Sequence, residues 1–379
     1  NLGGLVGWMQ KGQINSSIAY GNVTGSGDNV GGLVGKAGQS DVSSPAEISN
    51  SSATGLVIGV SNIGGLVGEN TGYSVVTGSD SSGTVTGSGN NIGGLVGNNA
   101  GSIVDSLTTT AGVSGVLDVG GLVGFNSDVG LVTNSHYNAS NVSINGVFRV
   151  TEGALYTGQF TSWQTNSRTL DIGNYPELPL NAGYHEISSV AGLRDLLGFA
   201  STPGLKFRLT ANIDLAAVTD GLHIPHFAAL ELDGAGHVVT SFNLSLPNNH
   251  AGFIGRLDAG TVKNIGIVGG SVSGEGGVAG LVGLNKGGTV NNAYSTATIT
   301  GGNGYDIGGL VGFNSGGTVS DSHSSANVTG GGGSTRTGGL VGANFGTIMG
   351  TSGLIASIGT TIGPLIAGIL ADMTGSYEV

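Results

Sequence analysis

The pentapeptide Gly-Gly-Leu-Val-Gly occupies residues 3–7, and the same five residues recur at 31–35, 64–68, 93–97, 120–124, 308–312 and 338–342. Residues 251–255 and 279–283 carry the variants Ala-Gly-Phe-Ile-Gly and Ala-Gly-Leu-Val-Gly. Between the first large apolar residues, the steps are 28, 33, 29 and 27 residues up to Leu122, then 28, 29 and 30 residues from Phe253 onward. A repeat period of about 20–50 residues indicates a stacked architecture.

The composition of the repeat decides between helical and β-stranded stacks. Glycine accounts for 77 of the 379 residues, and only 9% of residues are charged. Such a glycine-rich, polar unit is unsuited to helices, so we expect an all-β fold, a parallel β-helix (β-solenoid). The crossover preference of parallel strands predicts a right-handed one.

The unit at residues 308–337 illustrates the expected coil. Leu310 and Val311 predict one short strand, residues 318–324 alternate with the period of a second, and residues 326–329 predict a third. Glycines between them suit corners and close approach of neighbouring coils. Because one coil cannot bury its apolar face alone, stacking at about 4.8 Å per coil would supply both burial and hydrogen-bond partners.

Two sets of equivalent residues are expected to form ladders along the stack. The first large residue of the pentapeptide should point inward, at Leu5, Leu33, Leu66, Leu95 and Leu122 in one block and at Phe253, Leu281, Leu310 and Leu340 in another. The position four residues after the Leu holds asparagine in six of eight units, namely Asn70, Asn99, Asn126, Asn285, Asn314 and Asn344. Met9 and Ala37 interrupt this run. Stacked amides can hydrogen-bond along the axis, so we expect a structural role for these asparagines.

The repeats resemble the GLUG motif, named for its Gly-Leu-Val/Ile-Gly core, over roughly residues 1–136 and 251–350. A second segment, from residue 185 through 207–215 to 232–237, resembles the coil-initiating segment of filamentous-haemagglutinin-like exoproteins of the two-partner-secretion type. The resemblance implies a bacterial adhesin or related exoprotein, located outside the cell or on its surface. The chain begins with Asn1 inside a repeat, so we expect it to be an excerpt of a longer exported protein.

The pattern divides the chain into four parts. Repeat blocks are expected at residues 1–136 and 205–350. The aromatic-rich segment 137–204 between them contains apolar residues at helical spacing from residue 188 to 197, with Ser188 or Ser189 as N-cap, which predicts a short helix that caps the second block. The alternative is that this segment is a recognition surface.

The tail at residues 351–379 breaks the repeat. Residues 353–371 carry no charge and are long enough to span a bilayer, and together with residues 372–377 they resemble a late transmembrane helix of a major-facilitator transporter. Three interpretations stay open: a cap on the last coil, a chimeric segment, or a membrane anchor. We favour a cap that buries Leu354, Ile355, Leu365, Ile366 and Leu370.

Composition also limits the partners. The formal net charge of −12 argues against nucleic acid and anionic membranes as ligands. The chain has no cysteine, which excludes disulfides and thiolate metal sites. We expect no cofactor. A protein or glycan of a host or matrix is the expected partner, together with self-association through the ends of the solenoid.

Several carboxylates and histidines could serve either catalysis or structure. Asp214, Asp233 and His237, with His223 and His226 nearby, are the best candidates for a polysaccharide-processing β-helix enzyme. The two carboxylates stand in turn-like strings, where accepting backbone N–H bonds is the favoured role. His136 and His323 occupy equivalent repeat positions, where Tyr294 stands in another unit, which indicates packing or surface positions.

A single calcium motif is also present. Residues 301–306, ending at Asp306, match the first six positions of the calcium-binding nonapeptide of parallel β-rolls, but Gly308 replaces its large apolar residue. A turn is therefore favoured over a metal site. We expect a non-enzymatic stalk, with the polysaccharide enzyme and a self-assembling extracellular filament subunit as alternatives.

Overall fold

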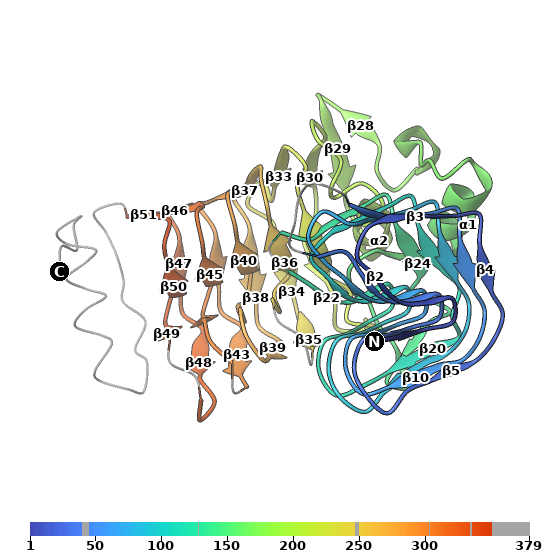
Figure 1. The fold of residues 1–379 in the computed structure, drawn as a ribbon. Coiled ribbons are helices and arrows are strands. Elements are labelled where there is room, and N and C mark those ends of the chain that lie inside the picture. The colour runs from blue at the N-terminus through green and yellow to red at the C-terminus, as the bar shows by residue number, and fades with distance from the viewer. Residues whose placement is uncertain (40–44, 128, 247–249, 303, 334–335, 351–379) are drawn as a thin grey trace. The chain divides into compact units, whose positions relative to one another are not determined.

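The computed structural model describes residues 1–39, 45–127, 129–246, 250–302, 304–333 and 336–350. These residues form parallel β-solenoid coils, about 12 turns in total, with two short α-helices (Figure 1). This confirms the all-β solenoid class. Contacts divide the chain into two compact units, which meet in sequence between Leu170 and Asp171.

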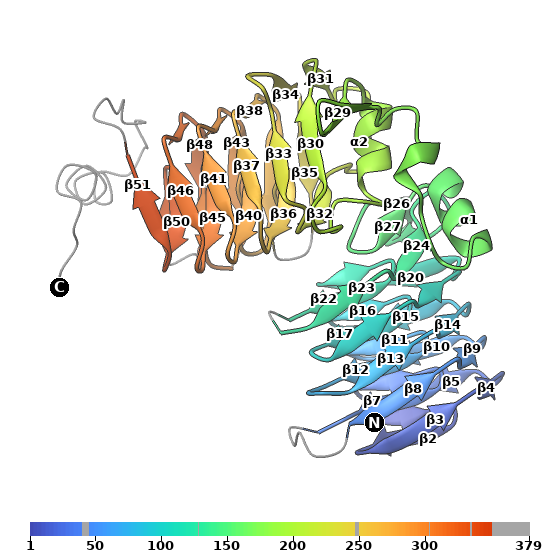
Figure 2. The same ribbon diagram turned by 90° about the horizontal axis from the view of Figure 1, so that it is seen from above.

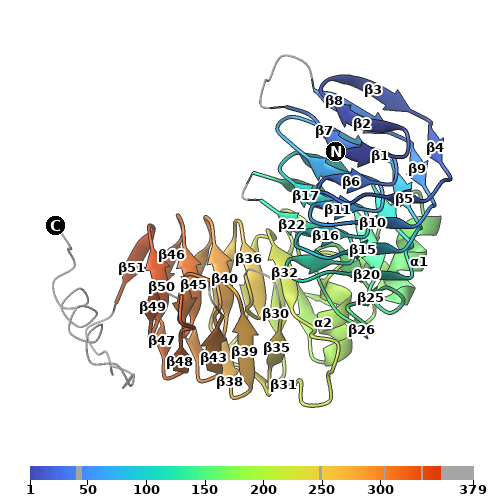
Figure 3. The ribbon, with the colours of Figure 1, turned by 60° about the horizontal axis from the view of Figure 1, so that its bottom comes forward.

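Unit 1 winds through five sheets, to which successive coils contribute short strands that pair in parallel, apart from one antiparallel pair near the end of the unit. Figure 3 shows the strands of successive coils lying side by side within unit 1. The sheets contain β1 (Leu2–Gly3), β6 (Val30–Gly31), β11 (Ile63–Gly64), β16 (Ile92–Gly93) and β21 (Val119–Gly120); β2 (Val6–Met9), β7 (Val34–Ala37), β12 (Val67–Asn70), β17 (Val96–Asn99) and β22 (Val123–Asn126); β3 (Gly12–Asn15), β8 (Ala46–Ser49), β13 (Val75–Thr77), β18 (Ser102–Val104) and β23 (Leu131–Thr133); β4 (Ile18–Ala19), β9 (Ser52–Ala53), β14 (Asp80–Ser81), β19 (Leu107–Thr108), β24 (His136–Asn138) and β27 (Ala154–Leu155); and β5 (Val23–Thr24), β10 (Val57–Gly59), β15 (Val85–Gly87), β20 (Gly112–Ser114), β25 (Ser143–Ile144) and β26 (Val147–Phe148).

Unit 2 repeats this architecture with its own sheets. They contain β28 (Leu180–Asn181), β29 (Tyr184–Ile187), β30 (Lys206–Leu209), β33 (Glu231–Asp233), β37 (Thr261–Lys263), β41 (Thr289–Asn291), β46 (Thr318–Ser320) and β51 (Thr347–Met349); β31 (Ile213–Asp214), β34 (Val238–Thr240), β38 (Gly266–Val268), β42 (Tyr294–Ser295) and β47 (His323–Ser324); β32 (Ile224–Phe227), β36 (Ile254–Leu257), β40 (Val282–Asn285), β45 (Val311–Asn314) and β50 (Val341–Asn344); β35 (Asn243–Ser245), β39 (Ser271–Gly274), β43 (Thr298–Gly301) and β48 (Asn327–Thr329); and β44 (Ile307–Gly308) and β49 (Thr337–Gly338). The two antiparallel pairs among these named strands, β25 with β26 and β28 with β29, lie where unit 1 ends and unit 2 begins.

The expected three-stranded coil is wrong, because the coils have more corners. In the unit at residues 308–337, the strand expected over 318–324 is broken into β46 and β47 by Asp321, whose φ is 51°. Asn292 and Asn264 hold the same left-handed corner in the two preceding coils, with φ of 47° and 52°. Asparagine and aspartate tolerate this conformation better than other residues with a side chain, so these corners need no glycine.

The pentapeptide glycines serve close approach between and within coils. A Cβ on Gly93 would lie 1.9 Å from the carbonyl oxygen of Val96, and a Cβ on Gly94 would lie 2.1 Å from that of Gly121 in the next coil. The first glycine of every other perfect copy would meet a carbonyl oxygen at 1.9–2.2 Å, and the second glycine would do so at 2.1–2.3 Å in the copies at residues 3–7, 31–35, 64–68 and 308–312. A Cβ on Gly121 would instead meet the ring of Tyr137 at 2.3 Å. A side chain at the first glycine would clash with its own coil and one at the second glycine with the next coil, which explains why both glycines recur in the repeat.

Segment 137–204 is divided between the two units instead of forming one insertion. Its first part adds α1 (Thr157–Thr165) to unit 1, where Phe160 and Trp163 pack with Leu107 and Leu155. Its second part adds the 3-10 turn η1 (Ile172–Asn174) and α2 (Val190–Leu196) to unit 2. The helix predicted at residues 188–197 is confirmed as α2, with Ser189 as its N-cap, and it lies beside β29 (Figure 2).

The predicted tail cap, and with it the transporter resemblance at residues 353–379, lies outside the described residues. Within the part of the chain that is described, no helix is both long and apolar enough to cross a bilayer.

Candidate functional site

The inward aliphatic stack occupies the centre of each unit. Leu33, Leu66, Leu95 and Leu122 are fully buried, and each of the first three donates its backbone N–H to the carbonyl of the equivalent leucine in the next coil at 2.8–2.9 Å. In unit 2, Phe253, Leu281 and Leu310 are buried in the same way. The pentapeptides therefore lie one above another in register.

Two members of the expected stacks are less buried than predicted. Leu5 is 54% exposed, although its N–H still bonds to the Leu33 carbonyl. It follows strand β1, which among the described strands pairs only with β6. Leu340 is half-buried in the last coil described.

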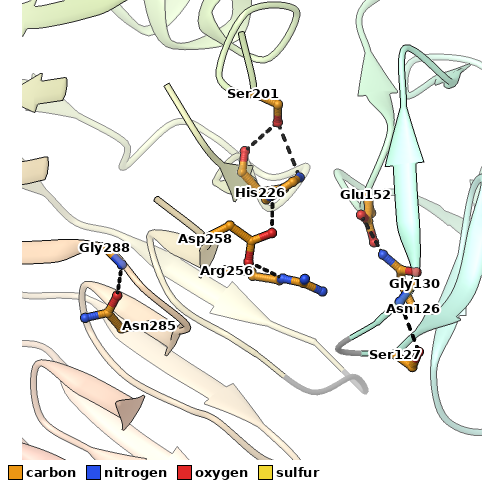
Figure 4. A network of polar contacts seen from close by, with 10 residues as sticks. All are labelled: Asn126, Ser127, Gly130, Glu152, Ser201, His226, Arg256, Asp258, Asn285 and Gly288. Carbon is orange, nitrogen blue, oxygen red and sulfur yellow. Dashed lines mark hydrogen bonds and ion pairs between the residues drawn. The ribbon is translucent and has the colours of Figure 1, made fainter. Parts of the chain in front are cut away.

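A ladder of buried amides runs along unit 1. Nδ2 of Asn70 donates to Oδ1 of Asn99 at 2.7 Å, and Nδ2 of Asn99 donates to Oδ1 of Asn126 at 2.8 Å. Asn126 donates in turn to Oε1 of Glu152 at 3.1 Å (Figure 4). Asn70 and Asn99 are fully buried, so each amide supplies the hydrogen-bond partner that water cannot supply to its neighbour. In the two preceding coils, the positions in register with Asn70 hold Ala37 and Met9, which have no side-chain amide.

The same ladder recurs in unit 2. Nδ2 of Asn285 donates to Oδ1 of Asn314 at 2.9 Å, and Nδ2 of Asn314 donates to Oδ1 of Asn344 at 2.6 Å. Asn285 also accepts the backbone N–H of Gly288 at 3.0 Å, which closes the following turn (Figure 4). The asparagines thus join neighbouring coils and hold the corner of their own coil.

Sequence reasoning missed a second ladder, made of serines. Oγ of Ser79 accepts the backbone N–H of Ser51 from the neighbouring coil at 3.1 Å and donates to the Thr77 carbonyl at 2.9 Å. Ser106 and Ser135 repeat this arrangement. Each serine follows a left-handed corner residue, so the signal was present in the sequence as a serine recurring every 27–29 residues.

A third ladder lies two residues before the pentapeptide. Asn62 donates to Oδ1 of Asn29 at 2.7 Å, and Asn91 donates to Oδ1 of Asn62 at 2.7 Å. All three have positive φ, between 54° and 62°. Asp306 occupies the equivalent corner in unit 2, with φ of 70°.

Asp306, the expected weak calcium candidate, faces a cation instead. Arg336 approaches both carboxylate oxygens, with Nε 2.6 Å from Oδ1 and Nη2 3.0 Å from Oδ2. Burial raises the pKa of Asp306, and the Arg336 charge opposes that shift. Among the described residues, no group of three or more His, Cys, Asp or Glu side chains is arranged to hold a metal ion.

The polysaccharide-enzyme candidates are dispersed over unit 2. Oδ1 of Asp214 accepts the Ala216 N–H at 3.1 Å, and Oδ1 of Asp233 accepts the Ala235 N–H at 2.8 Å, which is the turn role favoured from the sequence. Asp233 also lies 3.8 Å from Nζ of Lys263. Both carboxylates are therefore committed to local contacts.

The three histidines near these carboxylates have separate partners. His237 faces the side-chain oxygen of Asn212 at 3.2 Å. His223 is buried, with Nδ1 2.7 Å from the Gly221 carbonyl, and burial lowers its pKa to about 4. His226 contacts Asp258 through Nε2 at 3.0 Å, a pairing that no sequence pattern indicated.

The repeat-equivalent aromatic positions pack. Tyr294 and His323 are paired in register on β42 and β47, and their rings stack with centroids 5.1 Å apart. His136 packs edge-on against Trp163 at 4.8 Å, and burial lowers its pKa to about 4. The imidazole is therefore neutral at pH 7, as a packing residue would be.

The stacked pentapeptides and their ladders match a known repeat. The model of the GLUG motif matches residues 26–58, 59–86 and 303–329. The chain carries GLUG repeats. It is also 30% identical over 220 residues to Halomucin of Haloquadratum walsbyi (strain DSM 16790 / HBSQ001), a match that covers 52% of this chain and 2% of that protein. The chain thus spans a small fraction of the length of this relative.

A solved structure is similar over part of the chain. It is the crystal structure of a candidate immunoglobulin A1 protease from Bacteroides ovatus, 20% identical, with a TM-score of 0.36. The similarity covers 45% of this chain and 65% of that one.

Proposed function

We propose that this chain is a structural stalk segment of a secreted or surface-displayed bacterial adhesin, in which the stacked GLUG coils serve as a stiff spacer. The observation that carries the proposal is the amide ladder that links three successive coils in each unit. Asn70, Asn99 and Asn126 join three successive coils, and Asn285, Asn314 and Asn344 join three more. Parallel backbone hydrogen bonds accompany each link.

This arrangement suits a rigid spacer. Separating two coils breaks the backbone hydrogen bonds of up to five strand pairs together with one or more side-chain ladders. The amides of Asn70, Asn99, Asn285 and Asn314 are buried, so water cannot replace their partners until the coils part. A repeat protein in which each coil bonds only to its neighbours then resists bending and unwinds from its ends.

Force spectroscopy tests the structural part of the proposal. With the full chain tethered through its two termini, we expect each unit to hold its length and then unravel in steps of about one coil. A smooth extension without steps, like that of a flexible polymer, would contradict the stalk.

The adhesive part needs a separate measurement. We propose a protein or glycan of a host or matrix as the partner. Beads coated with the whole chain should adhere to arrays of matrix proteins or neutral glycans above the level of beads coated with an unrelated acidic protein of equal charge. The net charge of −12 makes nucleic acid an unsuitable partner, so adhesion confined to nucleic acid would contradict the proposal.

A further inference from the structure

A polar network on unit 2 links the turn after α2 to two adjacent coils. His226 on β32 is paired in register with Arg256 on β36, and Asp258 directly follows β36. Ser201 lies in the turn region beyond α2, 25 residues before His226. Figure 4 shows that Ser201 faces the imidazole of His226, and that His226 and Arg256 both face the carboxylate of Asp258.

The partners of the two ring nitrogens of His226 determine which nitrogen carries the proton. Nε2 of His226 lies 3.0 Å from Oδ2 of Asp258, and Nδ1 lies 3.3 Å from Oγ of Ser201. A carboxylate only accepts, so the neutral imidazole carries its proton on Nε2 and turns the lone pair of Nδ1 toward the serine hydroxyl. The hydroxyl has a second acceptor, the His226 carbonyl oxygen, at 3.5 Å.

The carboxylate is ionised and fixed in place. Although burial raises the pKa of Asp258, hydrogen bonds from His226 and Arg256 bring it well below its ordinary value. Nε of Arg256 is 2.5 Å from Oδ1, which leaves Oδ2 directed at the imidazole. Negative charge at this position stabilises the imidazolium that forms when His226 takes a proton.

The hydroxyl is open to solvent, whereas the groups behind it are more enclosed. Ser201 is exposed, and the side chains of His226 and Asp258 are each 23% exposed. His223, in the same strand region, offers no such site, because it is 2% exposed and its Nδ1 contacts a backbone carbonyl.

We propose that Ser201 is an acyl-accepting nucleophile, with His226 as its general base and Asp258 as the group that orients the imidazole. The ring nitrogens have the opposite assignment to that of the chymotrypsin triad, in which Nδ1 faces the aspartate. General-base catalysis needs one imidazole nitrogen with a lone pair facing the serine hydroxyl and the other with an N–H facing the carboxylate. The arrangement of Ser201, His226 and Asp258 supplies both. The activity is additional to the structural function of the coils.

The reaction is the transfer of an acyl group from an ester to water. Oγ of Ser201 attacks the carbonyl carbon while its proton passes to Nδ1 of His226. The carbon–oxygen bond to the leaving alcohol breaks, and the alcohol takes that proton. Water then attacks the acyl-serine, His226 accepts its proton and returns it to Oγ, and the carboxylic acid leaves. No oxidant, reductant or metal enters the balance.

Covalent labelling tests the proposal on the intact chain. The whole protein is incubated with a fluorophosphonate probe, and the modified residue is identified by mass spectrometry. We expect one adduct, on Ser201. His226→Gln should slow labelling about 100-fold, the lower bound for the loss of a general base.

A matched control separates reactivity from exposure. Ser325 is also exposed and lies on the same unit, so Ser325→Ala should label at the wild-type rate, whereas Ser201→Ala should not label. Because the adduct is mapped on the wild-type chain, the test does not depend on the variants folding. An unlabelled Ser201, or equal labelling of wild type and His226→Gln, would overturn the proposal and leave the network as a brace.

Discussion

Asn99→Ala is the sharpest test of the amide ladder. Asn99 is fully buried, accepts a hydrogen bond from Asn70 and donates one to Asn126. The substitution therefore strands one donor and one acceptor at the same time. A buried polar group left unpaired costs about 1–3 kcal/mol, so two such groups set a range of about 2–6 kcal/mol.

The structure places the expected value near the lower end of that range. Nδ2 of Asn70 keeps a longer contact with the Ser102 carbonyl at 3.4 Å, and Asn126 is half-buried, so water reaches its amide. We therefore expect Asn99→Ala to lower the free energy of unfolding of unit 1 by about 2–3 kcal/mol. The adjacent Asn98, half-buried on the same strand, is the matched control, and Asn98→Ala should stay within about 0.5 kcal/mol of wild type.

Urea unfolding followed by tryptophan fluorescence measures this difference. Both tryptophans of the chain, Trp8 and the fully buried Trp163, belong to unit 1, so the signal reports on the unit that carries the substitution. If Asn99→Ala changed the stability by less than about 0.5 kcal/mol, or if Asn98→Ala matched it, the ladder would not be the stabilising feature described here.

Three further predictions follow from single residues. Gly93→Ala should destabilise unit 1 by at least about 1–3 kcal/mol in urea unfolding, because its Cβ would meet the Val96 carbonyl oxygen at 1.9 Å, whereas Gly27→Ala, with no atom within 4 Å, should have little effect. Burial lowers the pKa of His223 to about 4, so below about pH 6.5 the unfolded chain binds a proton at this residue that the folded chain does not. Calorimetry should therefore show the free energy of unfolding falling between about pH 6.5 and 4, by on the order of 3 kcal/mol from this group. His223→Gln should remove this contribution to the pH dependence of stability. Because Arg336 pairs with Asp306, millimolar calcium should leave the melting temperature unchanged, and a rise that Asp306→Asn abolishes would show that the ion displaces the arginine.

Much of the fold could be predicted from the sequence because one signal repeats. The pentapeptide sets the period and the inward stack, and the asparagine at a fixed distance from its leucine predicts an amide column. The number of strands per coil was wrong because the corner residue Asp321 was interpreted as a strand position. Its side chain permits positive φ but does not require it, so the alternating pattern around it resembles one continuous strand.

Features outside the repeat were harder to predict. Helix α1 has a polar, threonine-rich sequence, and Phe160 and Trp163 are too few to give a helical apolar pattern. His226 was noted from the sequence, but its partners Ser201 and Asp258 could not be found. They lie 25 and 32 residues from His226, and only the registration of adjacent coils brings them together. That registration cannot be worked out from the sequence without knowing the length of each coil in this region.

Engineered disulfides test the in-register stacking of the coils most directly, since the natural chain has no cysteine. Thr298 and Asn327 are exposed register partners on β43 and β48, so their Cα atoms are about 4.8 Å apart, within the range a disulfide spans. Thr298 and Thr329 are offset by two residues, which places their Cα atoms about 8 Å apart, too far for the bond. After mild oxidation, we predict that the cysteine pair at 298 and 327 cross-links fully with the fold intact and that the pair at 298 and 329 stays reduced. Equal cross-linking of both pairs, or preference for the offset pair, would contradict the stacked-coil structure.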